Sequence, residues 1–202
     1  MKNLQDWTRS ALLLVDPQID LLSPQGGAWD LFGGQVEKRG TVDKMRRLRD
    51  AAEAAGVPVF YSRVELSGDE LAALEPRNGL QELILSRRLF EQGAGAAFLE
   101  ELAPTPTSVL LQPRKGPSSV HSDIAEQLRA RGIDTLVVTG MVANLCVESQ
   151  VRDAVDDGFR AIVVGDAVAT MSDEAHESAL SNFGLLATDV VSTDEVLTSL
   201  GA

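Results

Sequence analysis

Short apolar runs rich in leucine and β-branched residues alternate along this chain with longer segments of mixed polarity. The apolar runs cover residues 11–15, 57–62, 109–112, 135–139, 161–165 and 190–191. They are continuous rather than alternating, which is typical of strands that are buried on both faces of a sheet. Between them, four segments have the pattern of helices, namely residues 42–55, 123–131, 146–157 and 173–186.

This order of strands and helices predicts the fold class. Strand–helix–strand units form right-handed crossovers, which place helices on both faces of one sheet. We therefore expect an α/β protein, a three-layer αβα sandwich with a mainly parallel, Rossmann-like sheet of about six strands. Because no repeat, low-complexity tract or linker interrupts the pattern, residues 1–202 are expected to form a single domain.

The irregular part of the chain is the segment 65–103. Short amphipathic pieces are separated there by Pro76, Gly79, Gly93 and Gly95. The pattern fits a lid over a site or an excursion that forms a dimer, and it does not decide between them.

Composition narrows the classes of partner. The chain has 202 residues, with 30 acidic against 18 basic side chains and a net charge of −12. A negative field repels phosphate backbones and anionic lipids, so we expect no nucleic-acid partner and no membrane partner. No apolar run approaches the length of a membrane helix or of a signal-peptide core, and we expect a cytoplasmic protein.

The residues that hold metals and nucleotides are scarce. One cysteine and two histidines exclude an internal disulfide and a cysteine-pair zinc site, and they disfavour a histidine-rich metal site. The glycines do not fall at dinucleotide-binding or phosphate-loop spacing. We therefore expect no metal and no cofactor.

Three side chains that can do chemistry follow three different strands. Asp16 follows the run 11–15, Lys115 follows the run 109–112, and Cys146 lies in a turn after the run 135–139 where a helix begins. Taken singly, each has an ordinary explanation: a turn carboxylate, a solvated lysine and a small buried apolar residue. Together they lie at the carboxyl edge of one sheet, where α/β proteins bind ligands.

The three groups form a plausible catalytic set. A helix N-terminus stabilises a thiolate, so Cys146 can attack a carbonyl carbon. The Asp16 carboxylate can take the thiol proton, and the Lys115 ammonium can orient the pair.

On these residues the chain resembles the isochorismatase-like cysteine hydrolases, a superfamily that includes nicotinamidases and N-carbamoylsarcosine amidases. The matching motifs are residues 12–18 around Asp16, residues 113–115 with Ser118 and 122–124, residues 139–149 around Cys146 with 152–154, and residues 165–167 and 176–180. The resemblance covers most of the chain.

The resemblance implies roles for individual residues. Asp16 is then the general base, Lys115 the orienting cation and Cys146 the nucleophile of a thioester-forming amide hydrolysis. The family has a cis peptide bond that maps to Met141–Val142. This bond would aim the N–H of Val142, together with that of Cys146, into an oxyanion hole. Family members commonly form dimers or tetramers, so a homo-oligomer is expected.

Two departures from the family narrow the substrate. Residues 60–65 lack the histidines of metal-binding nicotinamidases, which disfavours a metal and nicotinamide, and segment 65–92 matches the family least. Trp29 and Phe32, in a Gly-rich loop after the first strand, are candidate pocket residues, with packing in the core or on the surface as the alternative.

The leading hypothesis is a metal-independent cysteine hydrolase that cleaves a C–N bond of a small amide, carbamoyl or ureido compound. An isochorismatase-type vinyl-ether hydrolase and a catalytically idle binding subunit remain alternatives.

Overall fold

A six-stranded parallel sheet forms the centre of the protein, a computed structural model of which describes residues 6–202. The strand order is β3-β2-β1-β4-β5-β6, and every paired strand runs parallel to its neighbour. The strands are β1 Ser10–Val15, β2 Val59–Ser62, β3 Val109–Leu110, β4 Thr135–Met141, β5 Arg160–Ala169 and β6 Asp189–Val191. The predicted α/β class with about six strands is confirmed.

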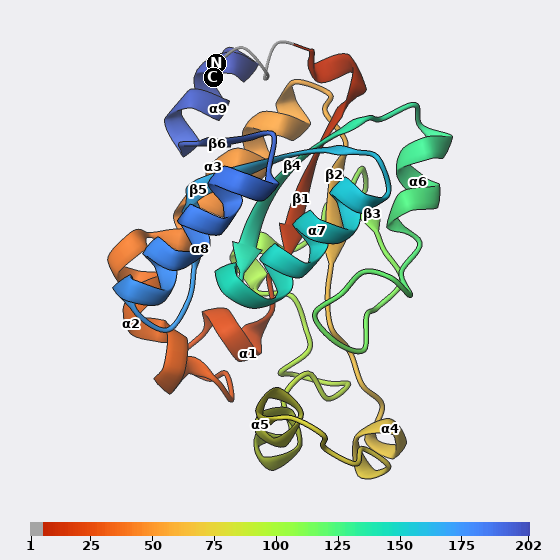
Figure 1. Cartoon of the computed structure of the whole chain (residues 1–202), viewed down its shortest axis with the longest axis vertical. Coiled ribbons are helices and arrows are strands. Elements are labelled where there is room, and N and C mark those ends of the chain that lie inside the picture. Colours follow the sequence, from red (N-terminus) through yellow and green to blue (C-terminus); the bar gives the residue numbers. More distant parts are fainter. Residues whose placement is uncertain (1–5) are drawn as a thin grey trace.

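Helices cover both faces of this sheet (Figure 1). On one face lie α2 Trp29–Arg39, α3 Thr41–Ala54 and α9 Thr193–Leu200, and on the other lie α6 Ile124–Ala130, α7 Glu148–Asp156 and α8 Asp173–Leu186. The remaining helices are α1 Ile19–Leu22, α4 Gly68–Ala72 and α5 Gly79–Arg87, with short turns η1 Trp7–Arg9, η2 Glu100–Leu102 and η3 Ala143–Val147. The three-layer sandwich is therefore confirmed.

Strand β1 shows why the apolar runs are continuous. Leu12 and Leu14 belong to the core under α2, α3 and α9, whereas Leu13 and Val15 belong to the core under α6, α7 and α8. All six residues of β1 are buried. Since successive side chains of a strand point to opposite faces, a strand between two helical layers needs apolar residues at every position.

The centre of the sheet is also its topological switch point. Strands β1 and β4 are hydrogen-bonded neighbours, although β2 and β3 lie between them in the sequence. The two strands approach closely where β4 ends, because a Cβ atom on Gly140 would lie 2.1 Å from the Val15 carbonyl oxygen. Gly140 has φ +122°, a conformation that also favours glycine. In open α/β sheets ligands bind at this carboxyl edge.

The segment after β1 differs from the expected Gly-rich loop. Residues Trp29–Arg39 form α2, despite the adjacent Gly33 and Gly34 in its middle. A Cβ atom on Gly33 would lie 2.4 Å from the Trp29 indole, so the glycine makes room for that ring on the helix surface. Glycine lowers helix propensity, and here the packing of the tryptophan compensates for it.

The irregular segment extends beyond the carboxyl edge of the sheet. It carries α4 and α5, which lie past the arrowheads of β1 and β4 in Figure 1. Ser67 and Glu70 form a capping box at the start of α4, and the Asn78 side chain caps α5. Within residues 6–202, no helix is long and apolar enough to cross a membrane. The same residues contain no cluster of three or more His, Cys, Asp or Glu side chains that could hold a metal ion.

Candidate active site

Asp16 lies at the end of β1, at the switch point. Its side chain is fully buried, and its backbone has φ +48°, in the left-handed region that a non-glycine residue adopts infrequently. The Asp16 N–H donates to the Ser62 carbonyl (2.8 Å), so β2 fixes its position. Unusual backbone conformations in buried polar residues are frequent at functional sites.

The cation beside Asp16 is Arg114 and not Lys115. Arg114 Nη2 donates to Asp16 Oδ1, and the two side chains are only 1% and 0% exposed. Lys115 points away, with Nζ bonded to the Glu65 carbonyl (3.0 Å) and to Glu70 Oε2 (2.6 Å), and its side chain is 52% exposed. The expected placement of Lys115 in the catalytic cluster is therefore corrected by one residue.

The guanidinium of Arg114 is held by several acceptors. Its Nε donates to Ser62 Oγ (2.8 Å), and Nη1 donates to the carbonyls of Gly116 (2.5 Å) and Pro117 (2.9 Å). The backbone of Arg114 pairs with Arg63 and Glu65. An arginine offers five donors in one plane, so it satisfies all these acceptors and Asp16 together, which a lysine ammonium cannot.

Cys146 lies where β4 passes into a helix. The turn η3, a π-helical turn over Ala143–Val147, leads directly into α7, and Cys146 is buried within it. Cys146 is a free thiol. Turns of this type are frequent at functional sites. As the sequence predicts, a carboxylate, a cation and a thiol meet at one sheet edge, with Arg114 as the cation.

Burial dominates the electrostatics of this cluster. It raises the pKa of the Asp16 carboxyl, an effect that Arg114 partly offsets. Burial, together with the negative charge of Asp16, raises the pKa of the Cys146 thiol well above its usual value of 9.0. Although burial alone lowers it, the negative charge of Asp16 holds the pKa of Arg114 above its usual range. The raised pKa favours the protonated thiol at Cys146, despite its place where a helix begins.

Arg114 Nη2 uses only one oxygen of the Asp16 carboxylate, Oδ1. Within residues 6–202, Asp16 Oδ2 is buried and has no hydrogen-bond partner. The thiol and the carboxylate interact closely enough for each to shift the pKa of the other. A buried acceptor with spare capacity beside a thiol can receive its proton.

The peptide bond between Met141 and Val142 is cis, as the resemblance implies. Val142 precedes η3, and both Val142 and Cys146 line the pocket described next.

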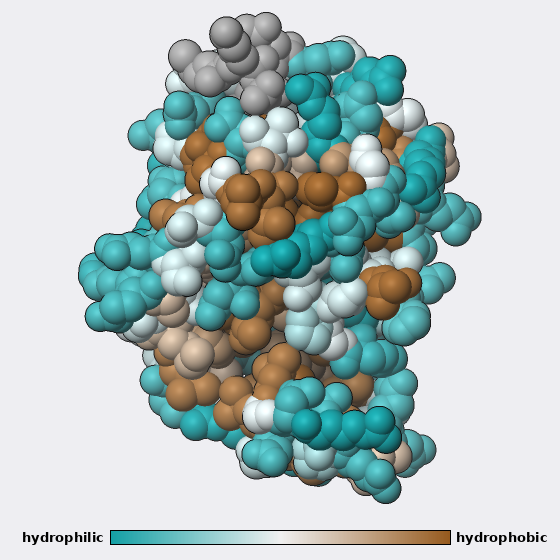
Figure 2. Space-filling view, in the orientation of Figure 1, coloured by the Kyte–Doolittle hydropathy of each residue, from teal (hydrophilic) through white to brown (hydrophobic). Residues whose placement is uncertain are grey.

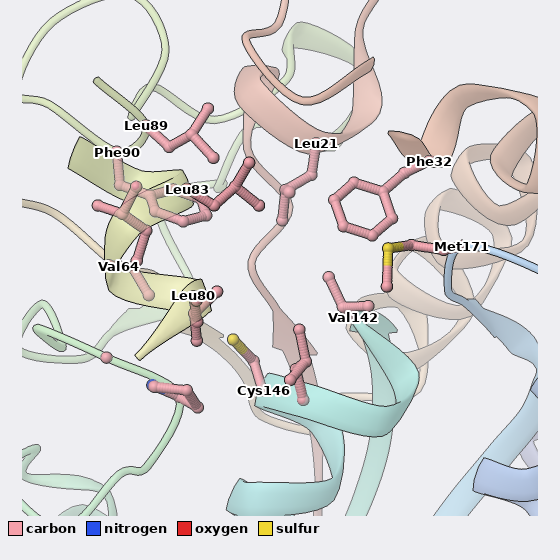
Figure 3. A pocket seen from close by; sticks show the side chains of 15 residues that line it. Leu21, Phe32, Val64, Leu80, Leu83, Leu89, Phe90, Val142, Cys146 and Met171 are labelled. Carbon is pink, nitrogen blue, oxygen red and sulfur yellow. The ribbon is translucent and has the colours of Figure 1, made fainter. Parts of the chain in front are cut away.

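A cavity of about 310 Å³ opens over Cys146. Its lining is Leu21, Phe32, Val64, Gly79, Leu80, Leu83, Ile84, Leu89, Phe90, Gly116, Pro117, Val142, Leu145, Cys146 and Met171. Figure 3 shows the Cys146 sulfur directed toward this space, with Leu80 close to it and with Phe32 and Met171 on the opposite wall. Phe32 is thus a pocket residue. Trp29 does not line the pocket but packs its indole over Gly33.

Two polar residues that the sequence did not assign hold the pocket wall in place. Asp20 accepts hydrogen bonds from the Gly27 N–H (3.1 Å) and the Phe90 N–H (2.6 Å). Gln18 bonds to the backbone of Val64 and to the Ala96 carbonyl. Both follow Asp16 closely in the sequence. Several polar residues close together after a buried strand are the sequence feature that could have indicated Gln18 and Asp20.

The loop after Arg114 is fastened to α7 by a third carboxylate. Asp153 Oδ2 accepts from Ser118 Oγ (2.8 Å), the Ser119 N–H (2.6 Å) and Ser119 Oγ (2.9 Å). Gly116 and Pro117 directly precede Ser118, and their carbonyls accept from Arg114 Nη1. The attachment of the loop therefore helps to position the Arg114 guanidinium as well as the part of the pocket that Gly116 and Pro117 line.

Comparison with known proteins agrees with this geometry. Residues 10–195 match the isochorismatase domain family. The chain belongs to the isochorismatase family. A ureidoacrylate amidohydrolase RutB of Stutzerimonas stutzeri is 31% identical over 209 residues, which cover 96% of this chain and 84% of that protein. The corresponding RutB of Methylorubrum extorquens is 32% identical, with 96% and 85% coverage.

Solved structures of the family share the fold. A cysteine hydrolase from Pseudomonas syringae pv. phaseolicola superposes with a TM-score of 0.81 at 26% identity, covering 97% of this chain and 94% of that one. The N-carbamoylsarcosine amidase of Thermoplasma acidophilum has a TM-score of 0.69 at 24% identity, with 92% and 97% coverage, and this likeness concerns the fold alone.

Proposed function

We propose that this amidohydrolase of small amide or ureido compounds works by cysteine catalysis, with Cys146 as nucleophile, Asp16 as general base and acid, and Arg114 as the fixed cation. The observation that carries the proposal is the buried contact of Asp16 with both the Arg114 guanidinium and the Cys146 thiol. The amidohydrolase class is supported by the family and by the activity of the RutB relatives.

The first half-reaction forms a thioester. Asp16 takes the proton of the Cys146 thiol while Sγ attacks the carbonyl carbon of the substrate. The N–H groups of Val142 and Cys146 hold the negative charge that develops on the carbonyl oxygen. The C–N bond then breaks as Asp16 returns the proton to nitrogen, which leaves as ammonia or an amine.

The second half-reaction hydrolyses the thioester. Asp16 takes a proton from water, whose oxygen attacks the acyl carbon, and the C–S bond breaks. The sulfur then recovers the proton from Asp16, which restores the resting site and releases the acid. Arg114 transfers no proton in these steps, because guanidinium stays charged; it holds the Asp16 carboxylate in place and stabilises its ionised form.

Ammonia release tests the proposal. The panel contains neutral amides, carbamoyl compounds and ureidoacrylate, and the Cys146→Ala variant is the control. Release by the wild-type protein is expected to vanish in Cys146→Ala with an unchanged circular dichroism spectrum. Release that persists in the variant, or hydrolysis of isochorismate that persists in it, contradicts the role of Cys146 and favours vinyl-ether chemistry.

Metal independence is part of the same proposal, because base, cation and nucleophile are all side chains of this chain. Ammonia release is expected to be unchanged after dialysis against a chelator, and a loss that a divalent cation restores contradicts it.

We also propose that the protein is a cytoplasmic homo-oligomer, either a dimer or a tetramer. The resemblance to a family whose members commonly form dimers or tetramers supports association between copies. Light scattering of the purified protein is expected to give a mass of two or four chains, and a monomer mass contradicts it.

A further inference from the structure

The substrate pocket of this protein has an unusual chemical character for an enzyme whose relatives act on ureidoacrylate. Apart from the Cys146 thiol, every side chain that lines it within the described residues is apolar, or is a glycine. No arginine, lysine, serine, threonine, asparagine or glutamine side chain is part of that lining. Ureidoacrylate carries a carboxylate, and a carboxylate needs a cation or several donors where it is buried.

Among residues 6–202, Arg114 is the buried cation beside the pocket, and its donors are already used. Arg114 uses its donors on Asp16, Ser62, Gly116 and Pro117 and lies outside the pocket lining. Lys115 bonds to Glu65 and Glu70 at the surface. Neither side chain is therefore available to a carboxylate at the far end of a bound substrate.

The apolar wall is firmly held. Phe90 has φ +58°, which is unfavourable for a bulky side chain. Its N–H donates to Asp20 and its carbonyl accepts from the Leu66 N–H (2.8 Å), so both sides of its peptide backbone are fixed. Leu83 and Ile84 of α5 complete this wall beside Phe90. A pocket that is held in shape before binding selects its ligand by complementarity.

Figure 3 shows which side chains lie around this space. The Cys146 sulfur lies at one wall, with Val142 nearby, and Leu83, Leu89 and Phe90 lie together across the cavity. The reacting carbonyl must contact Cys146, so the substituent on that carbonyl lies in the apolar space that α5 helps to enclose. Apolar residues also gather on the molecular surface at the level of α5 (Figure 2). Leu80 and Leu83 of α5 are half-buried.

We infer that the enzyme prefers neutral amides with an apolar substituent on the carbonyl carbon, and that it discriminates against carboxylate-bearing compounds such as ureidoacrylate. This inference rests on the proposed function and adds the substrate class. Leu80 and Leu83 are the residues of α5 that determine the specificity, since they are half-buried and line the pocket.

A matched pair of compounds tests the selectivity. Hexanamide and adipamate have the same chain and the same amide, and they differ in a terminal methyl or carboxylate. Hexanamide is expected to have the larger kcat/KM by about 100-fold or more, because the carboxylate loses its water without gaining a partner. Among acetamide, butanamide and hexanamide, kcat/KM is expected to rise about fourfold for each methylene. Higher kcat/KM for adipamate overturns the inference and leaves the cysteine mechanism standing.

A charge placed on α5 sharpens the test. Leu83→Lys adds a cation to the pocket wall and is expected to reduce the preference for hexanamide at least tenfold, through faster hydrolysis of adipamate. Ser86→Lys is the matched control, since Ser86 is an exposed residue of the same helix outside the pocket lining. An unchanged preference in Leu83→Lys, or an equal change in both variants, overturns the role of this wall.

A readout without turnover separates the two proposals. Cys146 is the only cysteine of the chain, so its alkylation by iodoacetamide reports whether the pocket is occupied. Hexanamide is expected to slow alkylation at a concentration where adipamate does not. If hexanamide protects but no compound of the panel releases ammonia, the proposed function fails and the selectivity stands. If adipamate protects better, the selectivity fails whatever the turnover.

Discussion

Two adjoining regions of this molecule are built in opposite ways. The cluster of Asp16, Arg114 and Cys146 is charged and buried, and its members follow the strands β1, β3 and β4 at one edge of the sheet. The cap, which we define as residues 65–92 with α4 and α5, is apolar where it faces the pocket, and its ion pairs Lys115–Glu70 and Arg88–Glu91 lie at the surface.

The difference assigns separate tasks to the two regions. The sheet edge brings chemical groups from distant parts of the sequence to fixed positions, which catalysis requires. The cap supplies shape and hydrophobic area, which decide what binds. Substitutions in the cluster should therefore change turnover or stability, and substitutions in the cap should change the choice of substrate.

The largest effect is expected from Asp16→Asn. An amide cannot accept the thiol proton, so kcat for hexanamide should fall about 10²- to 10⁴-fold. Asp69→Asn, an exposed acid in α4 of the cap, is the control and should keep its kcat. Ammonia release measured for both variants, with folding checked by circular dichroism, decides the point. Equal kcat in Asp16→Asn and the wild type contradicts the role of Asp16.

The next effect distinguishes the two neighbouring cations. Arg114→Met leaves the Asp16 carboxylate buried without its partner and should lower the free energy of unfolding by about 3–5 kcal/mol. Lys115→Met removes only a surface pair with Glu70 and should leave the free energy of unfolding unchanged within error. Urea denaturation of both variants measures this contrast, and a larger loss in Lys115→Met contradicts the assignment.

The loss of unfolding free energy in Arg114→Met should depend on pH. Burial raises the pKa of folded Asp16 above 3.8, and loss of Arg114 raises it further. A group with a raised folded pKa contributes stability in full below its unfolded pKa and loses it as pH rises through the folded value. The deficit of the variant should therefore be larger at pH 8 than at pH 5. A deficit that shrinks as pH rises contradicts this account.

A smaller effect is expected where the two regions are joined. Asp20→Asn replaces one acceptor oxygen by an NH₂ group that faces the N–H of Gly27 or Phe90, and it should cost about 1–3 kcal/mol of stability. Because Phe90 forms the pocket wall, KM for hexanamide should rise while kcat changes little. Glu82→Gln, on the exposed side of α5, is the control. A fall in kcat without a change in KM contradicts the positioning role.

The smallest expected effect is a shift of the Cys146 alkylation profile. Burial raises the pKa of this thiol above 9.0, so the rate of reaction with iodoacetamide should rise only at a higher pH than for an unfolded control in urea. Since the charge of Asp16 contributes to the shift, the profile of Asp16→Asn should move to lower pH. A midpoint below that of the unfolded control contradicts the resting protonated thiol.

The sequence alone predicted the sheet and two of the three groups of the cluster. Asp16 directly follows one apolar run and Cys146 lies in the turn after another, and a parallel sheet brings the carboxyl ends of such runs to one edge. Their positions depend mainly on where the strands end, so the pattern of apolar runs was enough to predict them.

Arg114 and Lys115 could not be separated in this way. Neighbouring residues of an extended segment point to opposite sides, so only one of the two cations can face Asp16. The choice depends on tertiary contacts, namely the acceptors that Ser62, Gly116 and Pro117 offer to a guanidinium. Composition and residue spacing do not indicate these tertiary contacts.

The pocket depended even more on tertiary packing. The glycines of α2 favour a loop as far as sequence alone is concerned, whereas the packing of Trp29 over Gly33 favours the helix. The cap contributes short helices and a backbone segment held by Asp20 to the pocket wall. Neither has a hydrophobic periodicity from which its place could be predicted.

Interception of the thioester by hydroxylamine tests the central claim most directly. With hexanamide as substrate, the wild-type protein should release ammonia and convert part of the acyl group to the hydroxamate. The Cys146→Ala variant, folded as judged by circular dichroism, should give neither product. Ammonia release that continues in Cys146→Ala, or that occurs in the wild type without any hydroxamate at high hydroxylamine concentration, contradicts acyl transfer to Cys146.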